Sequence, residues 1–396
     1  MITLRPYQKD AVEKSVEFFR SNSKLRPILE LPTASGKSLI IAYTVKELEG
    51  SVLILQPTME LLKQNYIKYT EAIEGNEDLD PPSVYSASVG IKQRARVTFA
   101  TIGSIHQKPE LFSDIQYVLI DECHMLPPKQ DSMYVSFISA LNKVKVLGLS
   151  ATPYRLKTYN DPFSGKKISK INLLNRERPM FFNSFLYNIT ARRMYKEGYL
   201  CPIKYLPLKF DDTLLERNST GAEFTDESIK RAIERNKIMR KIPDILEQAF
   251  KKGRRSALVF TQSVEESRLL SKKVPFSDYV HGKTPKKERA RIIKAFQEGT
   301  IKTLFNVGVL TTGFDYPALD TIIIARPTRS LVLYMQIVGR GIRLSEGKEY
   351  CAVVDMCGNI DRFGKIEELR IECDPIKGWV LRNDRKIISA KSLDDL

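Results

Sequence analysis

Residues 28–38 read Ile-Leu-Glu-Leu-Pro-Thr-Ala-Ser-Gly-Lys-Ser and are followed by an apolar segment from Leu39. This order predicts a buried strand, a loop over 32–38 and then a helix. Such a loop can bind phosphates through the N–H groups at the helix start, with Lys37 on the β and γ oxygens and Ser38 on magnesium. The strict GxxxxGK[ST] pattern is not met, because Leu31 takes the first glycine position. The strand–loop–helix context strengthens an otherwise moderate signal.

The same alternation of short apolar runs and helical patterns extends through most of the chain. Because continuous apolar strands separated by helices are typical of parallel sheets covered on both faces, the pattern predicts an α/β fold. It restarts after residue 250, so we expect a second α/β domain with a sheet of similar size. The predicted strands are 28–31, 51–55, 97–100, 117–120 and 144–149, then 256–260, 303–307, 321–324 and 352–355.

The charge balance indicates a polyanionic partner. The 63 Lys and Arg exceed the 47 Asp and Glu by 16, which favours nucleic acid over an anionic membrane. The five cysteines form no CxxC pair, which argues against a structural zinc site or a disulfide framework. The chain shows no apolar signal core and no run near 18 apolar residues, so we expect a soluble, cytoplasmic protein. We also expect it to be a monomer.

One stretch between the two patterns is strongly basic. Residues 155–196 contain ten Lys or Arg and two acids, with aromatic residues interleaved. We therefore expect residues 1–156 to form the first domain, 157–183 a basic connector or hairpin insertion, 184–373 the second domain and 374–396 a short tail. Lys166 and Lys167 of the insertion are candidate contacts to duplex DNA, and a solvated linker is the alternative.

Two carboxylates stand where the fourth predicted strand ends. Residues 118–120 read Val-Leu-Ile and run directly into Asp121-Glu122-Cys123-His124. Ligands of open α/β sheets bind at the carboxyl ends of the strands. Asp121 can hold magnesium, and Glu122 can polarise an attacking water. Solvated acids in a turn are the alternative, but the phosphate loop earlier in the chain favours an ATPase.

With these segments in order, the chain resembles the superfamily 2 helicases of the DEAH/DExH kind. The similar segments are the Q motif (4–8), motif I (33–38), motif Ia (56–61), motif Ib (100–104), motif II (121–124), motif III (150–153), motif IV (258–261), motif V (306–315) and motif VI (336–343). Residues 309–315, 336–341 and 198–200 are similar to the RadD (YejH) type of bacterial DNA-repair helicase, and phage branch-migration helicases are a related possibility. RadD has a cysteine-rich zinc region beyond the motor that this sequence lacks.

The resemblance implies two tandem RecA-like domains, each a mainly parallel sheet with helices on both faces, and an ATP-binding cleft between them. It also implies ATP and Mg²⁺ as cofactors. It implies catalytic roles for Lys37, Asp121, Glu122, Gln336, Arg340 and Arg343, with Ser38 and Asp121 on the metal. It implies nucleotide contacts by Arg5, Gln8, Thr33, Ala34, Ser35, Gly36, Lys37, Ser38, Gly313 and Asp315, with Gln8 on the adenine edge. Ala34 replaces a usual glycine, which the backbone tolerates if φ is not positive there. Arg340 and Arg343 are one helical turn apart and are expected to project from one face.

Candidate nucleic-acid contacts come from the same motifs and would bind the backbone without reading bases. They are Pro57, Thr58, Thr101, Gly103, Thr261, Gly282 and Thr311. Threonines at strand ends are also common caps, so each position is weak when taken alone. The coupling of the nucleotide and strand sites is expected to run through His124, Ser150 and Thr152.

The resulting prediction is an ATP-dependent DNA helicase or translocase that acts on forked, branched or single-stranded DNA in repair or recombination. It would be found in a bacterial cell and be encoded by a bacterium or a phage. Two alternatives stay open at this point. One is an RNA helicase, because the motifs bind backbone, and the other is an ATP-gated nucleic-acid clamp that does not unwind.

Overall fold

The computed structural model describes residues 3–76, 79, 81–127, 129, 131–160, 167–219, 221, 223–310, 314–375 and 378–388, without the side chains of 156–160, 167–170 and 378. The chain divides into two compact units. The first is Met1–Lys157 with Ile171–Thr190, and the second is Thr158–Lys170 with Ala191–Leu396. No helix in these described ranges is long and apolar enough to cross a membrane.

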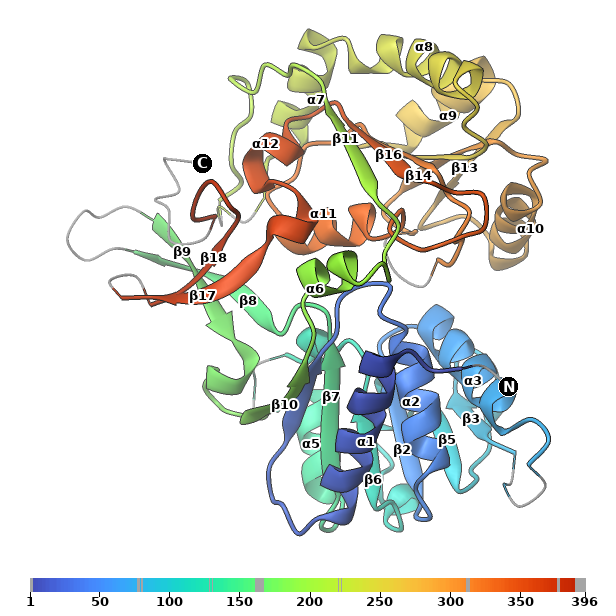
Figure 1. The fold of residues 1–396 in the computed structure, drawn as a ribbon, viewed down its shortest axis with the longest axis vertical. Coiled ribbons are helices and arrows are strands. Elements are labelled where there is room, and N and C mark those ends of the chain that lie inside the picture. The colour runs from blue at the N-terminus through green and yellow to red at the C-terminus, as the bar shows by residue number, and fades with distance from the viewer. Residues whose placement is uncertain are drawn as a thin grey trace. The chain divides into compact units, whose positions relative to one another are not determined.

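The first unit is built on an eight-stranded sheet in the order β10-β1-β7-β6-β2-β5-β3-β4 (Figure 1). All neighbouring strands pair in parallel except β3 and β4, which are antiparallel. The strands are β1 (Pro27–Glu30), β2 (Val52–Gln56), β3 (Ser83–Ser86), β4 (Ile91–Lys92), β5 (Val97–Thr101), β6 (Tyr117–Ile120), β7 (Lys145–Ser150) and β10 (Ser184–Asn188). The predicted parallel sheet is thus confirmed.

Alternating side chains of this sheet serve two cores, as a parallel sheet with helices on both faces requires. Ile28, Val118 and Val146 face a cluster that includes Phe137 of α5 (Met133–Ala140) and Ile102 of α4 (Ile102–Ile105). The other face is covered by three helices, of which α2 packs between the other two (Figure 1). They are α1 (Pro6–Arg20), α2 (Lys37–Lys46) and α3 (Met59–Ile73).

The second unit carries a six-stranded sheet in the order β11-β16-β15-β12-β14-β13, and every pair in it is parallel. Its strands are β11 (Ile203–Pro207), β12 (Ala257–Phe260), β13 (Ser277–His281), β14 (Thr303–Val307), β15 (Thr321–Ile324) and β16 (Cys351–Asp355). Four of them match predicted strands. The prediction missed β11 and β13. Both lie at an edge of the sheet, where their side chains are less buried, and neither is a continuous apolar run.

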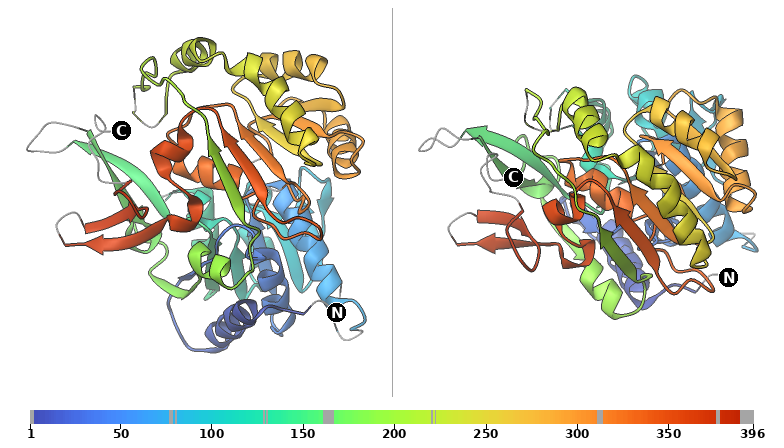
Figure 2. Two further views of the ribbon diagram at one scale, coloured as in Figure 1. Left: turned by 45° about the horizontal axis from the view of Figure 1, so that its top comes forward. Right: turned by 90° about the horizontal axis from the view of Figure 1, so that it is seen from above.

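Helices also cover the second sheet. Val259, Phe305 and Ile323 pack in one cluster with residues of three helices, α7 (Asp226–Arg235), α8 (Ile238–Lys251) and α9 (Val264–Lys273). The yellow helices of this group lie along one side of the sheet in Figure 2. The remaining helices of the unit are α6 (Ala191–Lys196), α10 (Lys286–Gln297), α11 (Leu331–Val338) and α12 (Asn359–Phe363).

Two segments differ from the predicted domain limits. Strand β10 at 184–188 pairs with β1 in the first sheet, although the sequence prediction starts the second domain at residue 184. Its pattern Ser-Phe-Leu-Tyr-Asn is only half-buried, so composition did not mark it as part of that sheet. Strands β17 (Arg370–Asp374) and β18 (Gly378–Arg382) form an antiparallel hairpin across the predicted start of the tail. In the predicted insertion, β8 (Tyr154–Asn160) and β9 (Lys167–Leu173) form a two-stranded sheet.

Candidate nucleotide-binding site

The predicted phosphate loop lies between β1 and α2 of the first unit. Leu39 and Ile40 donate their backbone N–H groups to Gly36 O, which closes the first turn of α2. The N–H groups at the start of a helix lack partners within the helix and attract anions. Gly36 has φ of 79°, and a Cβ there would stand 2.4 Å from Gln8 Nε2. Glycine at this position therefore avoids both backbone strain and a clash with Gln8.

The backbone of Ala34 is left-handed, with φ of 65°. The sequence analysis expected alanine to be tolerated here only where φ is not positive, and the structure contradicts that condition. A non-glycine residue in this region costs on the order of 1–3 kcal/mol. Such strain is typical of ligand-binding loops, and here the fixed ends of β1 and α2 hold the loop in place.

We expect Ala34→Gly to raise the thermal midpoint of the first domain by about 2–4 °C. Glycine relieves about 1–2 kcal/mol of left-handed strain and gives back about 0.4–1 kcal/mol through unfolded-chain entropy. Ala34→Val is the matched control, because a β-branched residue fits positive φ worse and should lower the midpoint. Circular dichroism melts of the three proteins measure this. Equal midpoints for the glycine and valine variants would contradict the strained loop.

Helix α1 contacts the phosphate loop through two side chains. Tyr7 Oη and Gln8 Nε2 each donate a hydrogen bond of 2.8 Å to Ser35 O. Gln8 Oε1 accepts a bond from the backbone N–H of Arg5, which forms a capping box at the start of α1. Gln8 is 4% exposed. The structure thus places Gln8 on the loop itself, and its predicted contact with adenine stays a prediction.

The acidic motif, which consists of residues 121–124, follows β6 in the same unit. Lys37 Nζ lies 3.4 Å from Glu122 Oε1, and the two side chains are 13% and 16% exposed. Strands β1 and β6 both border β7, so their carboxyl ends bring the phosphate loop and the acidic motif together. Glu122 has φ of 47°, a second strained non-glycine position in the site. The loop lysine and the acidic motif, which the sequence analysis assigned to one ATP site, therefore lie side by side in this unit.

The two adjacent carboxylates have different electrostatic surroundings. Burial and the charge of Glu122 raise the pKa of Asp121, although Lys37 and Asn65 oppose the rise. Burial would also raise the pKa of Glu122, but Lys37 and His124 outweigh it and lower that pKa. Glu122 is consequently ionised at neutral pH, as a group that accepts a proton from water must be. A cation beside Asp121 would stabilise its buried negative charge.

Asn65 of α3 is a site residue that the sequence analysis missed. Its Nδ2 donates a 2.9 Å hydrogen bond to Asp121 Oδ2, and Asn65 is fully buried. The backbone N–H of Glu122 donates to the other oxygen, Oδ1, at 2.9 Å. Asp121 is thereby oriented from two sides. The only sequence signal was an asparagine among the apolar positions of a helix, which is too common to be informative.

We expect Asn65→Ala to raise the Mg²⁺ concentration for half-maximal ATP hydrolysis by about 10–100-fold. Loss of a residue that orients a metal-binding carboxylate has this effect in other metal sites. Gln64→Ala, on the same helix and only partly buried, is the control and should leave the Mg²⁺ dependence unchanged. Steady-state hydrolysis across a Mg²⁺ series at fixed ATP measures it. A Mg²⁺ dependence of Asn65→Ala that equals that of Gln64→Ala would contradict the assignment.

The three predicted coupling residues lie in one hydrogen-bonded chain. His124 Nδ1 is 3.3 Å from Glu122 Oε2 and 2.9 Å from Ser150 Oγ. Ser150 Oγ in turn accepts the backbone N–H of Thr152 at 3.0 Å. Among the described residues, the buried Thr152 Oγ1 has no hydrogen-bond partner. A change at Glu122 can therefore reach the end of β7 through one histidine and one serine.

In the second unit, the guanidinium groups of Arg340 and Arg343 both contact the end of motif V, at Phe314. Arg340 Nη1 donates to Phe314 O at 2.6 Å, Arg343 Nη1 donates to the same oxygen at 3.2 Å, and Arg343 also pairs with Asp315. The expected helical spacing is wrong, because α11 ends at Val338 and both arginines follow it. A Cβ on Gly341 would stand 2.5 Å from Cys351 Sγ, so the turn there needs glycine. Gln336 lies within α11 and is partly exposed.

The predicted nucleic-acid residues fall into four groups. Thr58 Oγ1 accepts the backbone N–H of Leu61 and caps α3, and Thr101 Oγ1 is 2.9 Å from Ser104 Oγ. Thr261 is 1% exposed and bonds to Ser267 Oγ at 2.6 Å, so its side chain does not face outward as the prediction required. Open space surrounds Gly103 and Gly282, and Pro57 is partly exposed. Thr311, Lys166 and the side chain of Lys167 lie outside the described residues, as does Gly313, a predicted nucleotide contact.

Not every cation of the basic stretch is available to a partner. Arg155 forms an ion pair with the buried Glu177 and donates to His124 O at 2.9 Å. Arg193 pairs with Glu197, and Arg192 lies 3.6 Å from Asp384. The net positive count of this stretch therefore overstates its free charge, and Arg155 instead supports the acidic motif.

Two family models match the chain. "Type III restriction enzyme, res subunit" matches residues 1–155, and "Helicase conserved C-terminal domain" matches residues 237–345. The first match lies within the first unit and the second within the second unit, so both α/β domains of the chain are similar to helicase domains. The first match covers the phosphate loop and the acidic motif, and the second ends after Arg343.

Curated relatives agree with these matches. The chain is 27% identical over 387 residues to IRC3 of Saccharomyces cerevisiae, a protein named as an ATP-dependent helicase. The match covers 90% of this chain but 51% of IRC3. It is 26% identical over 375 residues to the ATP-dependent DNA helicase uvsW of Enterobacteria phage T4, with 88% of this chain and 67% of uvsW covered. The chain thus spans about half the length of IRC3. A bacterial or phage source and a cytoplasmic location stay predictions.

A solved structure shows the same fold. The Type ISP restriction-modification enzyme LlaBIII, solved bound to DNA, superposes with a TM-score of 0.63 at 17% identity. The match covers 90% of this chain and 28% of LlaBIII. The two-domain α/β fold expected from the sequence is thereby confirmed.

Proposed function

We propose that this protein is an ATP-dependent DNA helicase or translocase that acts on forked or branched DNA in repair or recombination. The observation that carries the proposal is the arrangement of Lys37, Glu122 and Asp121 in one unit, with Lys37 Nζ 3.4 Å from Glu122 Oε1 and Asp121 held by Asn65. A phosphate loop and an ionised carboxylate in this relation fit hydrolysis of a nucleoside triphosphate. The finer likeness to the RadD type and the DExH subclass belongs to the same proposal.

Each residue of the site has a definite task in hydrolysis. The N–H groups at the start of α2 and Lys37 bind the β and γ phosphates, and Glu122 accepts a proton from the attacking water. Ser38 and Asp121 offer a hydroxyl and a buried carboxylate, which are oxygen ligands that suit Mg²⁺. A bound Mg²⁺ would neutralise charge on the phosphates. His124 holds Glu122 in place and links it to Ser150.

Arg340 and Arg343 of the second domain complete the proposed site as arginine fingers. In this structure both guanidinium groups contact motif V, at Phe314 O. ATP would draw them to its γ phosphate and so close the two domains, and hydrolysis would release them. Repeated closure while both domains hold the strand moves the protein along nucleic acid. The open positions at Gly103 and Gly282 offer backbone N–H groups to phosphates.

DNA is the proposed substrate for two reasons. The net charge of +16 suits a polyanion, and the relative uvsW is named as a DNA helicase. The deciding experiment compares ATP hydrolysis stimulated by single-stranded DNA, forked DNA and RNA of matched length at one salt concentration. We expect forked or single-stranded DNA to stimulate at least tenfold more than RNA. Greater stimulation by RNA would transfer the proposal to an RNA helicase.

Strand displacement separates a motor from a clamp. A helicase displaces a labelled strand from forked DNA with ATP but not with a non-hydrolysable analogue. A clamp binds in both states and displaces nothing. DNA-stimulated hydrolysis that never moves a strand or a streptavidin block would support the ATP-gated clamp.

A further inference from the structure

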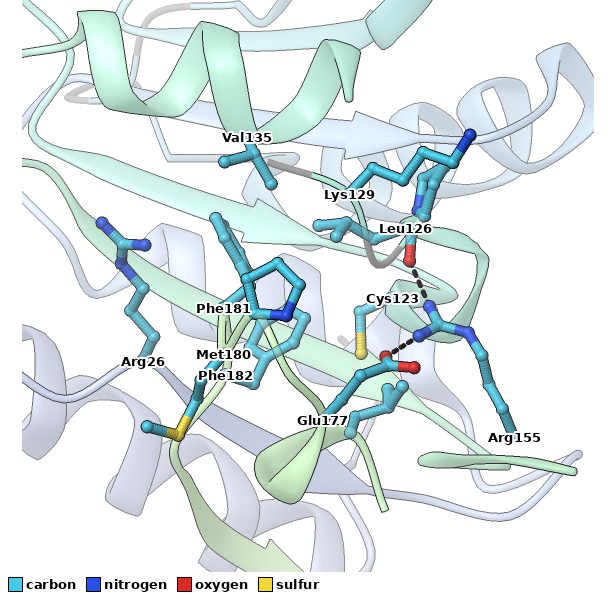
Figure 3. Close-up of a pocket in the computed structure, with 13 residues that line it drawn as sticks. Arg26, Cys123, Leu126, Lys129, Val135, Arg155, Glu177, Met180, Phe181 and Phe182 are labelled. Carbon is cyan, nitrogen blue, oxygen red and sulfur yellow. Dashed lines mark hydrogen bonds and ion pairs between the residues drawn. The ribbon is translucent and has the colours of Figure 1, made fainter. Parts of the chain in front are cut away.

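A pocket lies behind the acidic motif, wholly within the first unit and separate from the phosphate loop. It is a cavity of about 160 Å³ next to Cys123 and Leu126, closed on another side by Phe181 and Phe182 (Figure 3). Nothing in the proposed hydrolysis uses it. Its walls come from the acidic motif, helix α5 and the segment that follows β9.

Size and lining define what could occupy the pocket. An apolar cavity of about 150 Å³ in another protein binds benzene, so this one has room for a single aromatic ring or a branched aliphatic group. Leu126, Val135 and Phe182 provide apolar contact, and Met180, which is 49% exposed, stands at its edge. Methionine adapts its shape to different ligands. The pocket therefore suits one compact apolar group.

Three cations line the pocket, and their surroundings differ. Lys129 is exposed to solvent. Arg155 is neutralised by its ion pair with Glu177, which is 4% exposed and also accepts a bond from Asn172. Arg26 lies on the opposite side, with its guanidinium 4.8 Å from the centre of the Phe181 ring (Figure 3). Within the part of the chain that the structure describes, no carboxylate is within ion-pair distance of Arg26. Burial lowers the pKa of Arg26, which an anion beside it would reverse.

The pocket connects directly to the catalytic carboxylate. Arg155 donates to the carbonyl oxygen of Leu126 (Figure 3) and to that of His124, and both residues follow Glu122 in the chain. His124 in turn contacts Glu122 through Nδ1. A ligand that pushes on Leu126 or Arg155 must shift the loop that holds His124. Occupation of the pocket can therefore change the position of Glu122 without a contact to ATP.

We propose that this pocket binds a small carboxylate that carries one aromatic or branched apolar group, and that its binding changes the rate of ATP hydrolysis. The apolar group lies against Phe182 and Leu126, and the carboxylate pairs with Arg26. The regulatory half rests on the proposed ATPase function, whereas the binding half does not.

Binding is tested with 3-phenylpropionate, and 3-phenylpropanamide serves as its neutral isostere. The chain is labelled with ¹³C-methyl methionine, and the Met180 resonance is assigned with Met180→Leu. We expect a saturable shift of that resonance with the acid and at least tenfold weaker binding of the amide. Arg26→Gln should weaken binding of the acid at least tenfold, whereas Lys24→Gln, an exposed cation that does not line the pocket, should not. Equal binding of acid and amide, or equal effects of the two arginine variants, would overturn the site.

Regulation is tested by ATP hydrolysis with saturating DNA while the pocket is filled. We expect kcat to change at least twofold with 3-phenylpropionate and to be unaffected in Arg26→Gln at the same concentration. Val135→Phe, which places a ring in the pocket, should reproduce the change without ligand. Saturable binding with unchanged kcat would overturn the regulatory half. A protein that hydrolyses no ATP at all fails the proposed function, and the methionine shift still decides the binding half.

Discussion

Glu122→Gln is expected to bind ATP normally and to hydrolyse it about 10²–10⁴-fold more slowly than the native protein. The amide has the same shape as the carboxylate, but it cannot accept the proton of the attacking water. Lys37, whose Nζ lies 3.4 Å from Glu122 Oε1, remains available to the phosphates. The measurement is kcat under saturating DNA, together with the Kd of a fluorescent ATP analogue.

Glu13→Gln is the matched control for this variant. Glu13 lies in α1 with its side chain 63% exposed and paired only loosely with Lys9, at 3.9 Å. The same chemical change there should leave kcat and Kd unaltered. A Glu122→Gln protein that hydrolyses ATP within threefold of the native rate would show that another group activates the water.

The positions of the candidate site residues in the first domain could be predicted because these residues are close in sequence to strand ends. The phosphate loop directly follows β1 and the acidic motif directly follows β6. An apolar run that stops at such a motif fixes where its side chains emerge, since parallel strands end at one edge of the sheet. The meeting of Lys37 and Glu122 needed only that regularity.

Contacts that depend on packing between distant segments could not be predicted. Asn65 is 56 positions from Asp121, and its role depends on how α3 packs against the sheet. The seclusion of Thr261 likewise depends on Ser267 one turn into α9. Helix periodicity extended α11 through Arg343, but the turn at Gly341 is set by close approach to Cys351. The positive φ of Ala34 is a property of the loop that residue types did not reveal.

Arg343→Ala is expected to lower kcat about 10³–10⁵-fold and to change the Kd for ATP much less. An arginine finger stabilises charge that develops on the γ phosphate during transfer, so its loss affects the transition state more than the bound nucleotide. In this structure Arg343 pairs with Asp315, whose side chain is 46% exposed, so the guanidinium can exchange that partner for a phosphate. Single-turnover hydrolysis with saturating DNA measures the loss.

Two further variants separate a finger from a structural arginine. Arg343→Lys keeps the charge but not the planar fork and should recover only part of the rate. Arg291→Ala removes an exposed arginine of α10 that pairs with Glu288, and it should hydrolyse ATP normally. Arg340 is 7% exposed and holds Phe314 O, so Arg340→Ala should also destabilise the second domain by about 1–3 kcal/mol. If Arg343→Ala stays within tenfold of the native rate while it binds DNA fully, the second domain does not supply this catalytic charge.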